Sequence, residues 1–212
     1  MADIREICEL VQKGRYKNVK VLVEEALAEG QDPKAILNDG LLAGMMIIGE
    51  KFKVNEVYVP DVLVAARAMN TGLTVLEPKL VEIGNEPVGK VVIGTIVGDQ
   101  HDIGKNLVAM MLKGAGFEVI DLGVDVAPDA FIDKAEEVGA KIICISALLT
   151  TTMPGMQTVV ENLKARGLRD KYIVMVGGAP VNQAFADQVG ADSYTADAAS
   201  CAAVAKQAVE NK

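Results

Sequence analysis

After position 90 the apolar residues fall into short, nearly continuous runs, separated by amphipathic stretches with helical spacing. Such runs are typical of parallel strands that are buried on both faces. The predicted strands are Val91–Val97, Glu118–Leu122, Lys141–Leu148, Tyr172–Val176 and a weaker one at Ser193–Thr195. Strands that alternate with helices predict a doubly wound α/β domain, in which ligands bind at the carboxyl ends of the strands.

Residues 1–83 have a different pattern, because their apolar residues repeat with helical spacing throughout. Asp32 followed by Pro33 is typical of a helix N-cap and the first helical residue. Pro60 is expected to open the last helix of this half and Pro78 to end it. Four helices joined by short turns predict a small helical bundle.

The segment Gly84–Gly89 joins these two halves. It contains glycine and proline, which favour turns and loops, and it has no apolar residues at helical or strand spacing. We therefore expect a helical domain over residues 1–83, a linker over 84–89 and an α/β domain over 90–212.

The composition limits the classes of function. Acidic residues outnumber basic ones by 29 to 21, and the basic residues form no cluster, so no nucleic-acid partner is expected. Cys8, Cys144 and Cys201 lie far apart, which predicts neither a disulfide framework nor a zinc site. Neither a membrane-spanning stretch nor a signal peptide is recognisable, so we expect a cytoplasmic protein without membrane contact.

The stretch Gly98–Asn106, with the sequence GDQHDIGKN, directly follows the first predicted strand and contains the single histidine of the chain, His101. A lone histidine is more often structural than a ligand, but its surroundings favour a ligand. A histidine that binds a metal usually donates its other ring N–H to a carboxylate, and Asp99 is placed to accept it. Gly104 removes a side chain where a bulky ligand has to pass close to the backbone.

A single histidine also limits the kind of metal centre. A bare zinc or iron ion normally needs three or four protein donors. One imidazole can instead supply one axial ligand to a metal that a macrocycle already holds.

The D-x-H-x-x-G pattern of Asp99, His101 and Gly104 resembles the signature of cobalamin-binding domains in which histidine replaces the nucleotide base of the cofactor. Ser146–Leu148 at the end of the third strand resembles the S-x-L element of that family, and Gly177–Gly178 resembles its G-G element. The resemblance implies a flavodoxin- or Rossmann-like parallel sheet, with His101 as the protein ligand to cobalt.

The same resemblance implies further site residues. Small residues at the strand ends open a cleft for the displaced nucleotide tail of the cofactor. The implied cofactor-binding residues, besides His101, are Asp102, Ile103, Gly104, Ser146, Leu148, Thr150, Gly177 and Gly178. Catalytic roles are implied for His101 and Asp99, and for Thr152 at the position where the family has a relay serine, so the match there is not exact. The alternative for Ser146, Thr150 and Thr152 is helix capping.

In the helical half, Gly44–Phe52 and Val59–Leu63 resemble the cap of cobalamin-dependent methionine synthase and of corrinoid methyl carriers. In that cap, two apolar residues lie over the upper face of the corrin ring, and the matching positions are Phe52 and Val59. The alternative is ordinary bundle core, which we prefer for Met45, Ile48 and Leu63.

The order of cap, linker and corrinoid domain is similar to that of small corrinoid proteins in methyltransferase systems. This implies a cobalamin cofactor that alternates between cob(I)alamin and methylcobalamin, with cobalt as the methyl-carrying atom. It also implies donor-side and acceptor-side methyltransferases and a corrinoid reductive activase as partners. The methyl donor (a methylamine, methanol, a methoxyaromatic or a betaine), the acceptor (tetrahydrofolate or coenzyme M) and the natural corrinoid stay open.

The chain is expected to be non-catalytic alone, because donor-side domains are commonly barrels of about 250 residues, larger than this whole chain. Three rival functions remain. One is the cobalamin-binding subunit of an adenosylcobalamin-dependent mutase, which has no need of a helical cap. Another is a cobalamin-sensing regulator, which needs a DNA-binding unit. The last is a cofactor-free α/β domain, which would be colourless after reconstitution.

Overall fold

The computed structural model describes residues 2–210, and the chain divides into two compact units. Unit 1 runs to Glu86 and includes Gly114–Gly116, and unit 2 comprises Pro87–Lys113 and the residues from Phe117 onward. None of the helices within the described residues combines the length and the apolar character that crossing a membrane requires.

Unit 1 is a helical bundle. Its elements are α1 (Ile4–Gln12), α2 (Tyr16–Ala28), α3 (Pro33–Ala35), the π-helical segment η1 (Ile36–Leu42), α4 (Ala43–Lys53) and α5 (Val59–Glu82). The carboxylate of Asp32 accepts the backbone N–H of Lys34, the hydrogen bond that its N-cap position predicts. The core is aliphatic and includes Ile7, Val11, Val19, Val23, Ile36, Leu41, Met45 and Met69.

The prediction that Pro78 ends the last helix of unit 1 is wrong. Helix α5 continues through this proline to Glu82. Proline removes one intrahelical hydrogen bond and crowds the preceding turn. Burial of Leu76 and Leu80 on either side of it supplies apolar packing that offsets this cost.

The segment after α3 also differs from a regular α-helix. Ile36 and Leu41, both fully buried, are separated by the i to i+5 spacing of a π-helix. Gly40 and Gly44 lie on this segment and on α4, and a Cβ atom at either would meet α1. The wider turn therefore accompanies a close approach between two helices, which apolar periodicity does not reveal.

Unit 2 contains a parallel sheet, which confirms the predicted α/β class. Its strands are β1 (Lys90–Thr95), β2 (Glu118–Asp121), β3 (Ile142–Ser146), β4 (Ile173–Gly177) and β5 (Ser193–Tyr194), in the spatial order β2-β1-β3-β4-β5. The helical elements are α6 (Ile103–Gly114), α7 (Pro128–Val138), α8 (Pro154–Ala165), the short 3₁₀ helix η2 (Arg169–Lys171), α9 (Gln183–Val189) and α10 (Ala198–Glu210). This strand order is the doubly wound order of flavodoxin-like folds.

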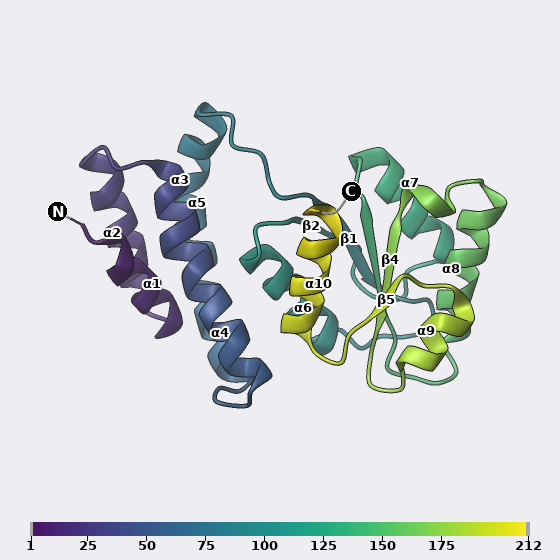
Figure 1. The fold of residues 1–212 in the computed structure, drawn as a ribbon. Coiled ribbons are helices and arrows are strands. Elements are labelled where there is room, and N and C mark those ends of the chain that lie inside the picture. Colours follow the sequence, from purple (N-terminus) through teal and green to yellow (C-terminus); the bar gives the residue numbers. More distant parts are fainter. Residues whose placement is uncertain (1, 211–212) are drawn as a thin grey trace. The chain divides into compact units, whose positions relative to one another are not determined.

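The sheet of unit 2 is covered on both faces. Figure 1 shows α6 and α10 on one side of it and α7 and α8 on the other. On the second side the strands and helices form an apolar core that includes Val92, Ile143, Ile145, Val174, Phe131, Ile132, Val159 and Leu163. Burial on both faces explains why β1, β3 and β4 are nearly continuous apolar runs.

The register of the strands brings the site together. Thr95, Ser146 and Gly177 are the last residues of β1, β3 and β4, and they pair with one another across the sheet. The loops that follow these strands therefore start from one edge. Strand order reverses between β1 and β3, and such a switch point is where open α/β sheets bind their ligands.

Candidate functional site

The carboxylate of Asp99 is the centre of the hydrogen bonds at this edge, and its side chain is fully buried. Its Oδ1 accepts the backbone N–H of His101 at 3.1 Å and faces the ring Nδ1 of His101 at 2.6 Å. Its Oδ2 accepts the backbone N–H groups of Leu148 at 2.7 Å and Leu149 at 3.1 Å, and the Thr152 hydroxyl at 3.0 Å. A buried carboxylate needs such donors to remain charged.

Opposing effects act on this carboxyl group. Burial by itself raises the pKa of Asp99. The hydrogen bond from the His101 ring and the backbone N–H groups of Leu148, His101 and Leu149 lower it more, so its pKa lies well below the ordinary value. Asp99 is therefore a carboxylate at neutral pH, able only to accept hydrogen bonds.

That charge state determines the tautomer of His101. Because the carboxylate only accepts, the proton of a neutral imidazole lies on Nδ1, and Nε2 keeps its lone pair. Nε2 has no hydrogen-bond partner within residues 2–210, and the side chain of His101 is 51% exposed. The hydroxyl of Thr95 holds the backbone here, because it donates to the carbonyl of His101 at 2.8 Å. The result is an oriented imidazole with one nitrogen available as a metal ligand.

Thr152 completes a chain of contacts from His101 through Asp99. Its hydroxyl lies 3.0 Å from Asp99 Oδ2 and 2.9 Å from the carbonyl of Leu149. A hydroxyl has one proton, and the charged carboxylate is the stronger acceptor. Helix α8 begins at Pro154, after Thr152, and no side chain caps its N-terminus.

Three predicted glycines have different surroundings. A Cβ atom at Gly104 or at Gly177 would meet no atom within 4 Å, so both border open space. A Cβ atom at Gly178, which has a φ of +133°, would lie 1.8 Å from the carbonyl oxygen of Ala147. Gly178 is therefore required by backbone packing, whereas Gly104 and Gly177 leave room for a ligand.

The remaining predicted residues of unit 2 lie at the same edge. Asp102 and Ile103 are exposed at the start of α6, where Asp102 accepts the side-chain amide of Asn106 at 3.0 Å. Ser146 is half-buried and Thr150 is exposed, and among the described residues neither side chain is recorded in a hydrogen bond.

Large apolar side chains are exposed around His101. They belong to the loops after β1 and β3 and to the first residue of α6, and they are Val97, Ile103, Leu148 and Leu149. Ile103 is 76% exposed. Within residues 2–210, no three side chains of His, Cys, Asp or Glu are grouped to hold a bare metal ion. One oriented nitrogen beside an apolar rim fits a metal held in a large apolar macrocycle.

The predicted cap residues belong to unit 1. Phe52 lies near the end of α4 and Val59 is the first residue of α5, and both are half-buried. Met45 and Ile48 are buried in the bundle core, as expected. Leu63 was also assigned to the core, which is wrong, because it is 43% exposed on α5.

Sequence reasoning missed several residues that hold the site. Lys105, which is 3% exposed, donates to Asp121 at 2.5 Å and to Asn106 at 2.7 Å, and so joins α6 to the end of β2. Asp125 contacts the loop that carries Asp99. Lys105 directly follows Gly104, so its place next to the motif could have marked it as a site residue. Its burial could not be predicted locally, because it depends on Asp121 of β2, 16 residues later.

Comparison with known proteins identifies the family. A family model described as a B12 binding domain matches residues 89–204, and a second model with that description matches residues 3–77. This chain belongs to the family of B12-binding corrinoid proteins. Its family, its fold class and its cobalamin cofactor are therefore as predicted.

The corrinoid protein has relatives that extend over most of its length. It is 50% identical over 175 residues to trimethylamine corrinoid protein 1 of Methanosarcina acetivorans, covering 82% of this chain and 81% of that protein. It is 46% identical over 211 residues to dimethylamine corrinoid protein 3 of the same organism, covering 98% and 99%. A solved structure of the methanol:cobalamin methyltransferase complex of Methanosarcina barkeri matches with a TM-score of 0.88 and 28% identity, covering 99% of this chain and 80% of that one.

Proposed function

We propose that this corrinoid protein accepts a methyl group from a donor-side methyltransferase and delivers it to a second, acceptor-side methyltransferase. The observation that carries the proposal is the 2.6 Å contact between Asp99 and Nδ1 of His101, which leaves Nε2 as a ligand beside an apolar rim. Cobalamin supplies a nucleophilic cobalt centre for methyl transfer when it is bound.

Each residue of the His101–Asp99–Thr152 chain has a separate task. His101 would hold the cofactor by offering Nε2 as the protein ligand to its metal. Asp99 holds the imidazole in that tautomer and accepts its Nδ1 proton in a hydrogen bond. Thr152 donates to Asp99 and helps to keep it charged.

The other predicted residues bind and shield. Gly104 and Gly177, which border open space, leave room for the nucleotide tail. Asp102, Ile103, Ser146, Leu148, Thr150 and Gly178 line the same edge of the sheet. Phe52 and Val59 of the cap would shield the bound cofactor from water, and the linker over residues 84–89 would be the hinge that lets the cap move.

For the methyl donor we propose a methylated amine. The support is that two relatives at 50% and 46% identity are named for trimethylamine and dimethylamine, whereas the methanol complex matches at 28%. A donor-side and an acceptor-side methyltransferase and a corrinoid reductive activase would then be the partners. The acceptor is tetrahydrofolate or coenzyme M.

The test is transfer of a labelled methyl group. The full chain is reconstituted with cobalamin, reduced, and mixed with a donor-side amine methyltransferase and ¹⁴C-methyl trimethylamine, dimethylamine or methanol. We expect label on the protein fraction from an amine and not from methanol. A chase with an acceptor-side methyltransferase and either tetrahydrofolate or coenzyme M should then remove it.

The matched control is His101→Ala, which should take up less cobalamin and show an altered cobalt spectrum. Absence of label from every amine, with reconstituted red protein present, would contradict the proposal. Stable binding of adenosylcobalamin together with a substrate-dependent radical signal would favour the rival function, a mutase subunit.

A further inference from the structure

We propose that Asp125 is a positioning residue that holds the loop of Asp99 and His101 in its ligand-presenting geometry. Asp125 lies in the loop between β2 and α7 and touches neither His101 nor the carboxylate of Asp99 in any recorded contact. The inference deepens the proposed function, because it takes His101 as the cobalt ligand.

Two hydrogen bonds join Asp125 to consecutive residues of that loop. Its carboxylate Oδ1 accepts the backbone N–H of Gly98 at 2.7 Å. Its own backbone N–H donates to the carbonyl of Asp99 at 3.0 Å. Asp125 thus holds the peptide unit that precedes the Gly98 Cα atom and the peptide unit that follows the Asp99 Cα atom. Fixing both ends of this two-residue stretch restricts rotation of the backbone that aims the Asp99 side chain.

The backbone of Asp125 supports a role for its side chain. Its φ is +56°, a left-handed conformation that glycine adopts without cost and other residues only at a penalty. Gly123, in the same loop, has a φ of +82°. Aspartate at position 125 tolerates the conformation better than most residues and adds an acceptor that glycine lacks.

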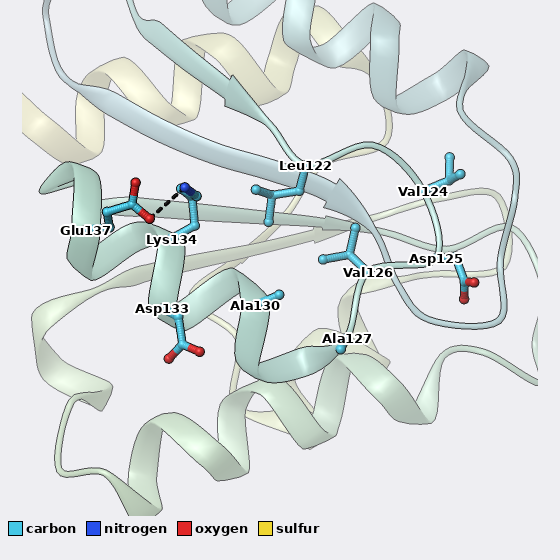
Figure 2. Close-up of a pocket in the computed structure, with 9 residues that line it drawn as sticks. All are labelled: Leu122, Val124, Asp125, Val126, Ala127, Ala130, Asp133, Lys134 and Glu137. Carbon is cyan, nitrogen blue, oxygen red and sulfur yellow. Dashed lines mark hydrogen bonds and ion pairs between the residues drawn. The ribbon is translucent and has the colours of Figure 1, made fainter.

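The other roles open to an exposed aspartate do not apply to Asp125. The N-cap residue of α7 is Ala127, so Asp125 does not cap that helix. Asp125 also lines a surface groove of about 470 Å³ between the β2–α7 loop and α7. Figure 2 shows it at the far end of that groove from the ion pair of Lys134 and Glu137. The one hydrogen bond recorded for its carboxylate within residues 2–210 is that from Gly98.

Asp125 also differs from the other supports of the loop. Thr95 holds the carbonyl of His101 from inside the sheet, and the backbone N–H groups of Leu148 and Leu149 bind the Asp99 carboxylate directly. Asp125 is exposed and outside the sheet, so its substitution can loosen the loop without opening the core. A looser loop should appear as a smaller fraction of the bound cobalt that carries the His101 imidazole.

The test compares Asp125→Gly with Asp125→Asn. Glycine keeps the left-handed backbone but removes the acceptor, whereas asparagine keeps the conformation and an amide oxygen at the same place. Glu137→Gln, on the same groove, is the control for loss of one exposed negative charge. His101→Ala reports the cobalt signal without the ligand.

Two readouts are recorded on the full chain. Amide hydrogen exchange by NMR, without cofactor, measures how often the Gly98 N–H opens. Electron paramagnetic resonance of the chain loaded with cob(II)alamin shows nitrogen splitting of the cobalt lines when an imidazole is bound. For Asp125→Gly we expect Gly98 exchange roughly 10- to 100-fold faster, the loss of a hydrogen bond to a charged group, and weaker nitrogen splitting. Asp125→Asn and Glu137→Gln should resemble the unchanged protein.

The outcomes separate the two proposals. Unchanged nitrogen splitting in Asp125→Gly, with the splitting absent in His101→Ala, overturns the role of Asp125 and leaves His101 as the ligand. Identical cobalt spectra for the unchanged protein and His101→Ala overturn the proposed ligand, and the positioning role with it. If Asp125→Gly and Asp125→Asn lose the nitrogen splitting and the Gly98 protection equally, the hydrogen-bond acceptor at position 125 is not the cause, and the proposal is overturned.

Discussion

The hydroxyl of Thr152 lies 3.0 Å from Oδ2 of Asp99, although the two residues are 53 positions apart in the sequence. They meet because β1 and β3 are neighbouring parallel strands, and the loops that follow them leave the sheet at the same edge. The contact therefore spans the switch point of the sheet and connects the third strand to the histidine on the first loop.

Removing this hydroxyl should weaken the fold of unit 2 without abolishing it. Thr152→Val keeps the shape of the side chain but leaves Oδ2 of Asp99 with two backbone donors. We expect a loss of about 1 kcal/mol in the free energy of unfolding, measured by urea denaturation of the cofactor-free chain. Thr152→Ser, which retains the hydroxyl, should lose less. Equal losses in the two variants would assign the effect to packing rather than to the hydrogen bond.

Asp99→Asn should have a larger effect. An amide in this position places an NH₂ group against donors on one side or the other, because both carboxylate oxygens accept N–H groups. We expect a loss of roughly 2–4 kcal/mol in the free energy of unfolding, the range for a charged acceptor removed from a buried network. The imidazole of His101 should also lose its fixed tautomer, which the cobalt spectrum of the loaded protein would report.

The stability difference between the unchanged protein and Asp99→Asn should depend on pH. Folding lowers the pKa of Asp99, so the ionised group stabilises the folded state fully above its unfolded pKa, near the ordinary 3.8. That contribution is lost as the pH falls from there toward the lower pKa of the folded state. Urea titrations at pH 7 and pH 3 should therefore show a smaller difference at pH 3. A difference that grows on acidification would contradict the lowered pKa.

The paired glycines at the end of β4, Gly177 and Gly178, should respond differently to substitution by alanine. Gly178→Ala places a Cβ atom against the carbonyl of Ala147 and should cost about 2–4 kcal/mol of stability in the cofactor-free chain. Gly177→Ala meets no atom and should leave stability nearly unchanged. If Gly177 leaves room for the cofactor, its substitution should weaken cobalamin binding by about tenfold, or 1.4 kcal/mol. Unfolding curves and cobalamin titration separate the two effects.

Pro78→Ala should stabilise unit 1. Alanine restores an intrahelical N–H at an exposed position inside α5 and removes the steric conflict with the preceding turn. The greater freedom of the unfolded chain offsets part of the gain, so we expect about 1–2 kcal/mol. Thermal unfolding followed by circular dichroism measures this change. A lower midpoint would show that α5 uses the proline.

Local patterns were sufficient to predict the elements of unit 2. Helix α7 has local signals at both ends, because Pro128 opens it and Gly139, in a left-handed conformation, ends it. The stretch after β1 was recognisable for the same reason, since Asp99, His101 and Gly104 lie within six residues. The helix end at Pro78 was predicted wrongly, because the packing of Leu80 is not visible in a local pattern.

The sequence by itself determined the class of fold, the loop that carries the histidine and the residue types of a corrinoid site, since these depend on neighbours a few positions apart. Only the tertiary structure decided how Asp99 stays charged, through N–H groups of Leu148 and Leu149 that belong to another strand end. It also decided that Asp125 hydrogen bonds to the loop of Asp99 and His101 and that Lys105 is buried against Asp121. These contacts depend on the order of strands in the sheet, which brings distant segments together without a periodic signal in any of them.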